Sequence, residues 1–195
     1  MFARSLRPLV VGVGSALLTL LASSAFADGP YAGFGVGRAT AKDDFTQIRI
    51  PTDDTDSGGK FFVGYKFERN AGIEIGYADL GEFVGRSGTT YSDTFRAKAI
   101  TAALVGQVPA SDNVALLFRL GFANWDVEDT IRTGGSMFPA SDTGIDLTYG
   151  IGAQLNFSKT VGMRVEWEQF ADVGTDTTTG KTGIDLLSAS LVFGF

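Results

Sequence analysis

The sequence predicts an all-β fold, an eight-stranded antiparallel up-and-down transmembrane β-barrel. Apolar side chains recur at every second position in eight separate segments, most of them close to the ~9–11 residues that a tilted strand needs to cross a bilayer. Long polar connections alternate with short turns between these segments, as they do in membrane barrels. The face opposite the apolar one holds glycines and charges of both signs, which suits a narrow lumen.

The last third of the chain shows the alternation most clearly. One segment runs from Thr143 to Phe157, with polar residues such as Asp146 and Gln154 at alternate positions. After a turn at Ser158–Thr160 the alternation resumes in Val161–Glu168. A run of about fifteen residues exceeds an ordinary soluble strand. We therefore interpret the apolar side as facing lipid and the charged side as lining a lumen.

The strands and connections follow in order along the chain. Strands are expected at residues 30–37, 60–67, 73–77, 100–108, 114–123, 143–157, 161–168 and 187–195. Long polar loops are expected at residues 39–58, 81–93, 126–142 and 172–183. The alternative is a soluble barrel of the lipocalin kind, with its apolar side chains inside. That arrangement would put Gly33, Gly35, Arg164 and Glu166 on the solvent face, where mid-strand glycines weaken a sheet without benefit.

The aromatic side chains near strand ends support this orientation. Girdles of such residues sit at the lipid headgroups of membrane barrels. The outward residues expected to form them are Tyr65, Phe67, Tyr77, Phe122, Trp125, Trp167 and Phe193.

The N-terminus predicts export through a signal peptide at residues 1–27. Arg4 and Arg7 precede an apolar run of 13 residues, and Ala25–Ala27 forms a small-residue cleavage site. An N-terminal membrane helix is the alternative, but a span needs ~20 apolar residues. We expect cleavage after Ala27 and a barrel domain over residues 28–195 in the cell outer membrane.

The composition of this domain excludes several classes of function. Removal of Arg4 and Arg7 leaves 14 basic and 22 acidic side chains, a net charge of −8, which argues against nucleic acid as a partner. The chain has no cysteine and no histidine. Thiolate sites are therefore excluded, and the commonest general base and transition-metal ligand is missing.

Several segments resemble the transmembrane domain of the OmpA-like outer-membrane proteins. They are Gly72–Gly81, Phe118–Gly121, Arg164–Trp167 and the terminal Phe195. The resemblance covers residues 28–195 and implies the same barrel. Phe195, with apolar residues at alternate positions before it, resembles the signal read by the barrel-assembly machinery, which is thus an expected partner. The resemblance does not extend to the periplasmic peptidoglycan-binding domain of larger members, so anchoring to the cell wall is not expected.

Five charged residues are the candidate functional residues of the lumen. Glu74, Arg119, Arg164, Glu166 and Glu168 all fall on the inward face. An unpaired charge in a low-dielectric wall is costly, so we expect a lumen charge network. In it, Arg164 pairs with Glu74 or Glu166, and Arg119 takes another acid.

The resemblance implies a comparison with a gate proposed for the family. There one acid exchanges partners between an arginine and a lysine, and the corresponding acid and arginine here are Glu74 and Arg164. The exchanging lysine falls at about Ala103 and its resting acid at Gln154, so both members of the second pair are missing. We therefore expect a plugged scaffold, with a gated narrow pore as the alternative.

No catalytic, cofactor-binding or metal-binding residues are expected. Ser188 and Ser190 lack a neighbouring base, and Glu166 and Glu168 are interpreted as wall charges. The acidic run Asp53–Asp56 suggests calcium but lacks EF-hand spacing, so a solvated loop is the favoured interpretation.

The predicted function is that of an envelope structural and surface protein in contact with outer-membrane lipids and lipopolysaccharide. Its external loops are available for adhesion or host contact. The alternatives are a narrow, low-conductance solute channel and, less favoured, a lipid-modifying enzyme.

Overall fold

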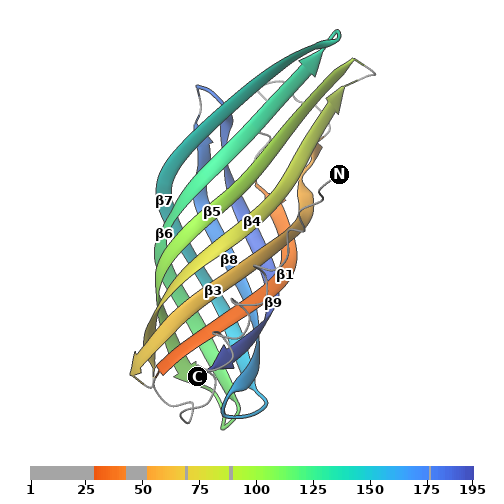
Figure 1. Cartoon of the computed structure of the whole chain (residues 1–195). Coiled ribbons are helices and arrows are strands. Elements are labelled where there is room, and N and C mark those ends of the chain that lie inside the picture. Colours follow the sequence, from red (N-terminus) through yellow and green to blue (C-terminus); the bar gives the residue numbers. More distant parts are fainter. Residues whose placement is uncertain (1–28, 43–51, 69, 88–89, 176) are drawn as a thin grey trace, which may run out of the picture.

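A computed structural model describes residues 29–42, 52–68, 70–87, 90–175 and 177–195. These residues form one closed antiparallel β-barrel (Figure 1). None of them forms a helix with the length and hydropathy needed to cross a bilayer. The predicted signal peptide, residues 1–27, lies outside the described residues.

Eight long strands and one short strand make up the sheet. They are β1 (Gly29–Ala41), β2 (Thr52–Asp53), β3 (Thr55–Glu68), β4 (Ala71–Ser87), β5 (Tyr91–Pro109), β6 (Val114–Thr133), β7 (Ser136–Asn156), β8 (Val161–Thr175) and β9 (Gly180–Gly194). The short β2 pairs only with β4. The barrel closes because β1 pairs with both β3 and β9, while β4 pairs with β5. The predicted fold class is confirmed.

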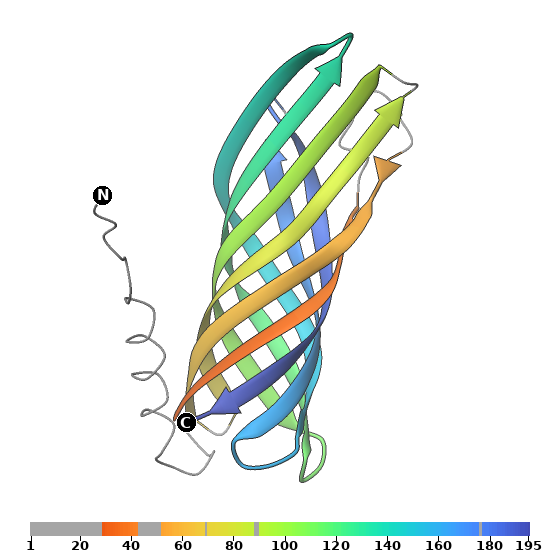
Figure 2. The ribbon, with the colours of Figure 1, turned by 45° about the vertical axis from the view of Figure 1, so that its right-hand side comes forward.

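One end of the barrel carries the short turns. The turns at residues 109–113 and 157–160 are closed by backbone hydrogen bonds such as Ala110 N to Val114 O, 2.8 Å, and Phe157 N to Val161 O, 2.9 Å. The first and last strands also meet there, with Phe195 N donating to Pro30 O at 3.0 Å (Figure 2). We call this the turn end and the opposite one the hairpin end.

The strands continue much further toward the hairpin end than the sequence predicted. The β4–β5 ladder reaches the pair Ser87 and Tyr91, and the β6–β7 ladder reaches Thr133 and Ser136. The tight β6–β7 turn uses Gly134 and Gly135, both with positive φ. The predicted loops at residues 81–93, 126–142 and 172–183 are therefore wrong, since all three are mostly strand. Within 39–58, residues 43–51 lie outside the described part.

Polar side chains misled the prediction of those loops. A β ladder satisfies backbone groups whatever the polarity of the side chains, and only the alternation reports the strand. On β6 that alternation persists beyond Phe122, but with the faces exchanged: Trp125 and Val127 are buried, while Glu128 is exposed.

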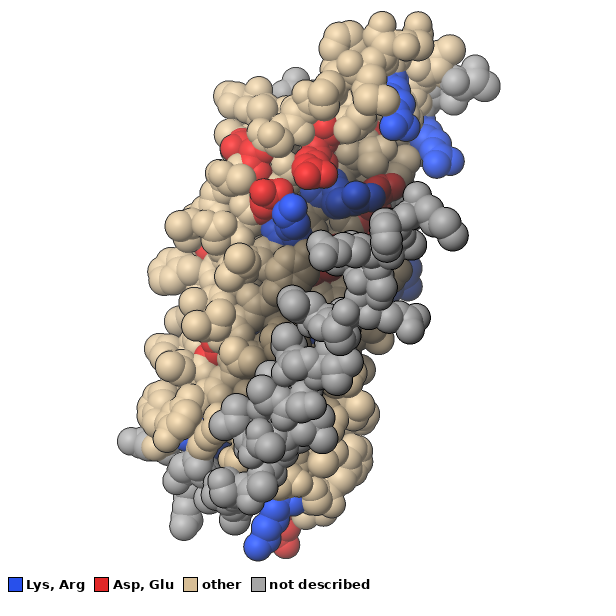
Figure 3. All heavy atoms as spheres, viewed as in Figure 1, with Lys and Arg blue, Asp and Glu red and all other residues tan. Residues whose placement is uncertain are grey.

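Toward the turn end, large apolar side chains cover the outside of the barrel. We call this surface the apolar belt. Where it is visible in Figure 3, it is the largely uncharged zone between the charged side chains near the hairpin end and those at the turn end. Its exposed members include Phe34, Val36, Phe61, Val63, Tyr65, Ile73, Ile75, Tyr77, Ile100, Leu104, Leu116, Phe118, Leu120, Phe122, Ile145, Leu147, Ile151, Leu155, Met163, Val165, Leu187 and Leu191. Apolar side chains on the outside and charges inside are the arrangement of a barrel in lipid.

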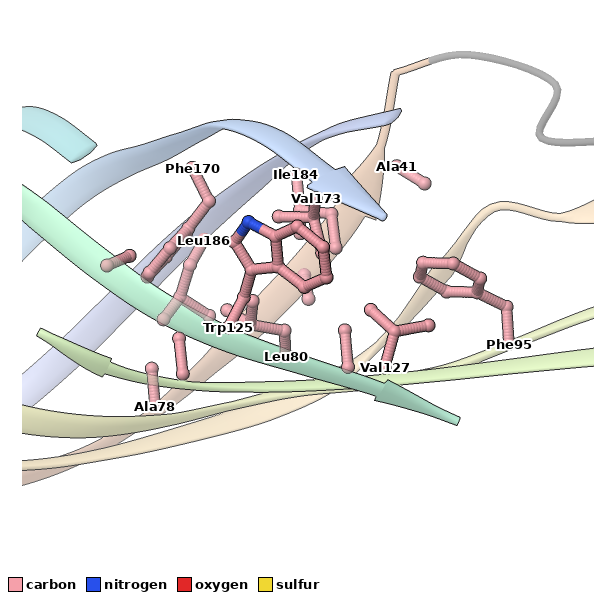
Figure 4. Close-up of a cluster of buried hydrophobic side chains, with 14 of the residues drawn as sticks. Ala41, Ala78, Leu80, Phe95, Trp125, Val127, Phe170, Val173, Ile184 and Leu186 are labelled. Atoms are coloured by element: carbon pink, nitrogen blue, oxygen red, sulfur yellow. The ribbon is translucent and has the colours of Figure 1, made fainter. Parts of the chain in front are cut away.

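Toward the hairpin end the arrangement inverts, and an apolar plug fills the lumen (Figure 4). The plug consists of Ala39, Ala41, Ala78, Leu80, Phe83, Phe95, Ala97, Ala99, Ala123, Trp125, Val127, Phe170, Val173, Ile184 and Leu186. Trp125 is only 3% exposed, so its predicted place in the outer aromatic girdle is wrong. The alternation that turns Ala123 inward also turns Trp125 inward. Above the belt, the barrel is thus built like a water-soluble one.

Candidate functional site: the charged layer of the lumen

Between the apolar plug and the turn end, charged side chains from four strands meet in the lumen. The predicted residues Glu74 on β4, Arg119 on β6 and Arg164, Glu166 and Glu168 on β8 are all buried, with at most 5% of their surface exposed. The alternation of each strand explains their common direction, because their neighbours in sequence belong to the apolar belt. We call this set, together with Lys60, the charged layer.

Glu74 is the centre of one half of the charged layer. Its Oε1 lies 2.6 Å from Arg164 Nη1, and its Oε2 lies 2.5 Å from Arg119 Nη1. Tyr31 donates its hydroxyl to Glu74 Oε1 at 2.8 Å. One carboxylate thus accepts from two guanidinium groups and a phenol, so both of its oxygens have partners inside the lumen.

Glu168 and Glu166 form the other half of the charged layer. Lys60 Nζ lies 2.8 Å from Glu168 Oε2 and 3.2 Å from Glu166 Oε2. Arg119 Nε lies 3.0 Å from Glu168 Oε1, and Thr148 donates to the same oxygen at 3.1 Å. Arg119 therefore connects the two halves, because it contacts both Glu74 and Glu168.

Neutral groups complete the surroundings of Arg164. Gln154 Oε1 accepts from both Nε and Nη2 of Arg164 at 3.2 Å. The guanidinium carbon also lies 4.7 Å from the centroid of the Phe62 ring, within the range of a cation–π contact. At the position where the family comparison expects an acid, this chain thus holds Arg164 through a neutral amide.

Lys60 is the member of the charged layer that sequence reasoning left out of the candidate residues. Its side chain is only 4% exposed and contacts two acids on β8, more than 100 residues away in sequence. The sequence did indicate that Lys60 points into the lumen, because it alternates with the outward Phe61 and Val63. With Lys60, three basic and three acidic side chains balance. Buried charges are tolerated when they are paired in this way.

The apolar plug above the charged layer leaves its polar atoms satisfied. The indole of Trp125 donates from Nε1 to Asp146 Oδ2 at 3.1 Å. Gly144 stands beside the same indole, and a Cβ at this position would overlap the ring. The lumen is consequently filled by two successive layers of side chains, one charged and one apolar.

Two carboxylates lie on the inward face above the plug, outside the belt. Asp93 and Asp129 come from the paired strands β5 and β6 and are 9% and 6% exposed. Burial, followed by the hydrogen bond and the charge of Asp93, raises the pKa of Asp129 to about 7. Burial and the same two carboxylates raise the pKa of Tyr91.

The acidic run that suggested calcium has a structural use in its described part. Asp56 Oδ2 accepts from Glu82 N at 2.8 Å, and Asp56 Oδ1 accepts from Ser57 N at 2.7 Å. These backbone donors lower the pKa of Asp56. Gly81, next to Glu82 in the register shift of β4, has φ of +84°. Among the described residues, no group of three or more acidic side chains is arranged to hold a metal ion.

A family model described as "Outer membrane protein beta-barrel domain" matches residues 13–195. The chain belongs to this outer-membrane β-barrel family. This match, together with the relatives described next, supports an OmpA-like barrel located in the outer membrane. Membership explains the apolar belt, because the barrel sits in the membrane among lipids.

Curated relatives include Outer membrane protein A from two organisms. That of Shigella flexneri is 25% identical over 148 residues, covering 74% of this chain and 42% of the relative. That of Salmonella typhi is 24% identical over 168 residues, covering 85% of this chain and 48% of the relative. The chain thus spans less than half the length of these relatives.

Several solved structures share the fold of this chain at low sequence identity. The attachment invasion locus protein Ail of Yersinia pestis has a TM-score of 0.55 at 19% identity, covering 85% of this chain and 99% of Ail. Neisserial surface protein A has a TM-score of 0.61 at 14% identity, with coverages of 86% and 97%. Ail has also been solved with the heparin analogue sucrose octasulfate, at a TM-score of 0.54 and 17% identity.

Proposed function

We propose that this barrel is a closed, non-conducting surface protein that displays its long hairpins outside the cell. The observation that carries the proposal is the contrast between a filled lumen and hairpins that extend well beyond the apolar belt. The charged layer and the apolar plug block the axis, whereas the β4–β5 ladder continues to the pair Ser87 and Tyr91 and the β6–β7 ladder to the turn at Gly134 and Gly135. Because these hairpins extend beyond the membrane and do not line a pore, they are available to contact molecules outside the cell.

The orientation follows from the lengths of the connections. Membrane barrels have short periplasmic turns and long external segments, so the hairpin end faces outward. In this orientation both ends of the barrel domain lie on the periplasmic side, as expected after export through the predicted signal peptide at residues 1–27 and assembly through the Phe195 signature. Ail, which shares this fold, is named an attachment invasion locus protein and has been solved with sucrose octasulfate, and this supports a contact role here.

Absence of cysteine from the chain permits a direct test of display. We would introduce single cysteines by Gly135→Cys in the β6–β7 turn and by Lys159→Cys at the turn end, and treat intact cells with a membrane-impermeant maleimide. The proposal expects labelling of the first variant on intact cells and of the second only after the outer membrane is permeabilised. The reverse pattern would overturn the orientation.

Conductance tests the closed lumen. In planar bilayers the refolded barrel should show no large, long-lived open state, because its axis is filled at two levels. A stable open state of the unmodified protein would instead favour the narrow channel. Binding of sucrose octasulfate to the refolded protein in nanodiscs would give a first probe of external contact.

Catalysis is not part of the proposal. The relatives named above are outer-membrane proteins rather than enzymes. Ser188 and Ser190 are 3% and 4% exposed on the inward face of β9, and the Ser188 hydroxyl donates to the backbone oxygen of Glu166 at 3.4 Å. Unchanged lipid A in mass spectra of cells with and without the gene would agree with this assignment.

A further inference from the structure

Two apolar grooves lie on the outer surface, one on each side of strand β8. In one row of the sheet, Ala153 on β7, Val165 on β8, Ala189 on β9 and Val36 on β1 are successive register partners. Because the two alanines are short, the surface drops on both sides of Val165. The groove over Ala153 has a volume of about 400 Å³, and the groove over Ala189 one of about 240 Å³.

Both grooves are bounded by members of the apolar belt. The outward walls of the first are Leu116, Phe118, Ile151, Val165, Trp167 and Leu187. Those of the second are Phe34, Val36, Met163 and Leu191. A slot in the lipid-facing surface of a membrane barrel is covered by hydrocarbon, because leaving apolar walls uncovered in the bilayer forfeits dispersion contacts. In a bilayer, lipid acyl chains are therefore the groups that can cover these grooves.

An exposed cation lies at the hairpin end of the grooves. Arg38 follows Val36 by two residues on the same outward face of β1, and it is the register partner of Leu187. Its side chain is exposed and forms no ion pair within the described part of the chain. Arg38 thus stands where the belt ends, at the level of lipid headgroups.

A second cation reaches the same place from further along β1. Lys42 Nζ lies 5.7 Å from the centroid of the Trp167 ring, which walls the larger groove. The same nitrogen lies 3.2 Å from Asp185 Oδ1, so one of the two positive charges is balanced locally. Arg38, Lys42 and Asp185 together leave one net positive charge above the grooves.

The opposite side of the barrel provides a contrast at the same level. There Arg96 pairs with Glu82, and Lys98 Nζ lies 3.4 Å from Asp126 Oδ1. The basic side chains at that position are thus matched by acids. Next to the grooves, the exposed Arg38 lacks an acidic partner at this level, as Arg86 and Arg132 do nearer the hairpin tips, among the described residues.

We propose that β1, β7, β8 and β9 form a binding site for a phosphorylated membrane lipid. Acyl chains occupy the grooves over Ala153 and Ala189, and the phosphate lies between Arg38 and Lys42. A guanidinium donates two parallel hydrogen bonds to a phosphate, and an indole at the headgroup level fixes the depth of the lipid. In the orientation proposed above, on which the choice of leaflet rests, the ligand is a lipid of the outer leaflet.

The test measures lipid retained by the full barrel in detergent by native mass spectrometry. Lipid A carrying its phosphates is compared with lipid A from which the phosphates have been removed. The unmodified protein should retain the phosphorylated form preferentially. Arg38→Gln should weaken its retention about fivefold, since a basic residue near a charged lipid surface contributes ~1 kcal/mol, and should leave the dephosphorylated form unchanged.

Groove variants and matched controls separate the two halves of the site. Ala153→Leu combined with Ala189→Leu fills the grooves and should reduce retention of both lipids. Lys98→Gln removes a basic side chain and Ala102→Leu enlarges an alanine on β5, away from the grooves, and neither should alter retention. Heat-modifiable migration on gels verifies that each variant is folded.

Two results would overturn the site. One is equal retention of the two lipids by the unmodified protein, and the other is equal loss in Arg38→Gln and Lys98→Gln. The measurement is made in detergent and does not depend on orientation. A negative result for lipid binding is thus distinguishable from a failure of surface display, because the cysteine labelling tests surface display separately.

Discussion

Arg164 on β8 and Glu74 on β4 meet across the lumen, with 2.6 Å between Nη1 and Oε1, although 90 residues separate them in sequence. Neither strand is a sheet neighbour of the other. The contact therefore exists only because the barrel closes. It places a buried ion pair at the point where the charges of β3, β4, β6 and β8 converge.

Removal of Arg164 should destabilise the barrel strongly. Arg164→Met leaves Glu74 with Arg119 as its single remaining cation, and loss of one partner of a buried pair costs about 3–5 kcal/mol. Urea unfolding in lipid vesicles, followed by tryptophan fluorescence, measures the change. The double variant Glu74→Gln, Arg164→Met should recover part of the loss. Arg96→Met, which breaks an exposed pair with Glu82, should cost below about 1 kcal/mol.

A charge on the apolar belt should be far more damaging than one above it. Leu120 and Glu128 both face outward on β6, but only Leu120 lies in the belt. Leu120→Arg should cost about 2–4 kcal/mol near the middle of the bilayer, whereas Glu128→Arg stays in water and should cost little. The same unfolding assay compares them. Similar losses for the two variants would contradict the limits assigned to the belt.

Truncation of the plug should weaken the hairpin end without opening a pore. Trp125→Ala removes a buried indole and leaves Asp146 without its donor, at a cost of about 3–5 kcal/mol. Conductance in planar bilayers should stay low, because the charged layer below still fills the lumen. Gly144→Val, which displaces the same ring from the other side, should reproduce the loss of stability. A conducting Trp125→Ala barrel would show that the charged layer alone does not close the axis.

The hairpin end should be more stable in mild acid than at neutral pH. Burial and Asp93 raise the pKa of Asp129 from 3.8 to about 7, so between these values the folded state keeps a proton that the unfolded state releases. Stability of this region therefore falls as pH rises from about 4 to 7 and is level above that. Hydrogen exchange of the β5–β6 amides above the belt, at pH 5 and pH 8, measures it.

Asp129→Asn should remove this pH dependence, because the amide does not titrate. Asp112→Asn, in an exposed turn, is the matched control and should keep it. Asp93 and Tyr91 face the same carboxylate, so each variant is compared with the unmodified chain at both pH values. Faster exchange at pH 5 than at pH 8, after correction for intrinsic rates, would contradict the raised pKa of Asp129 as the cause.

Part of the charged layer could be foreseen from alternation alone. Glu74, Arg119 and Arg164 fall between apolar neighbours, so a lipid-facing assignment for those neighbours already turns the charges inward. Lys60 obeyed the same rule. Its partners could not be assigned, because they depend on which side chains from distant strands reach one another at a given height in the barrel.

The predicted loops failed for a related reason. In residues 126–133 the alternation continues, but the inward face holds Val127 and Asp129 while Glu128 faces water. Residues 136–139 are all exposed, the apolar Met137 and Phe138 included. Without knowing where the membrane ends, this exchange of faces is indistinguishable from polar loop sequence. Trp125 was misplaced at the boundary itself, where the inward face changes from polar to apolar.

By itself, the sequence determined the strand period, the number of long strands and the side that meets lipid, because a period of two assigns each residue to one face. Only the tertiary structure decided how far the strands extend, which charges pair, and where the plug and the grooves lie. Those features depend on closure and stagger of the sheet, which bring side chains from distant strands to the same level.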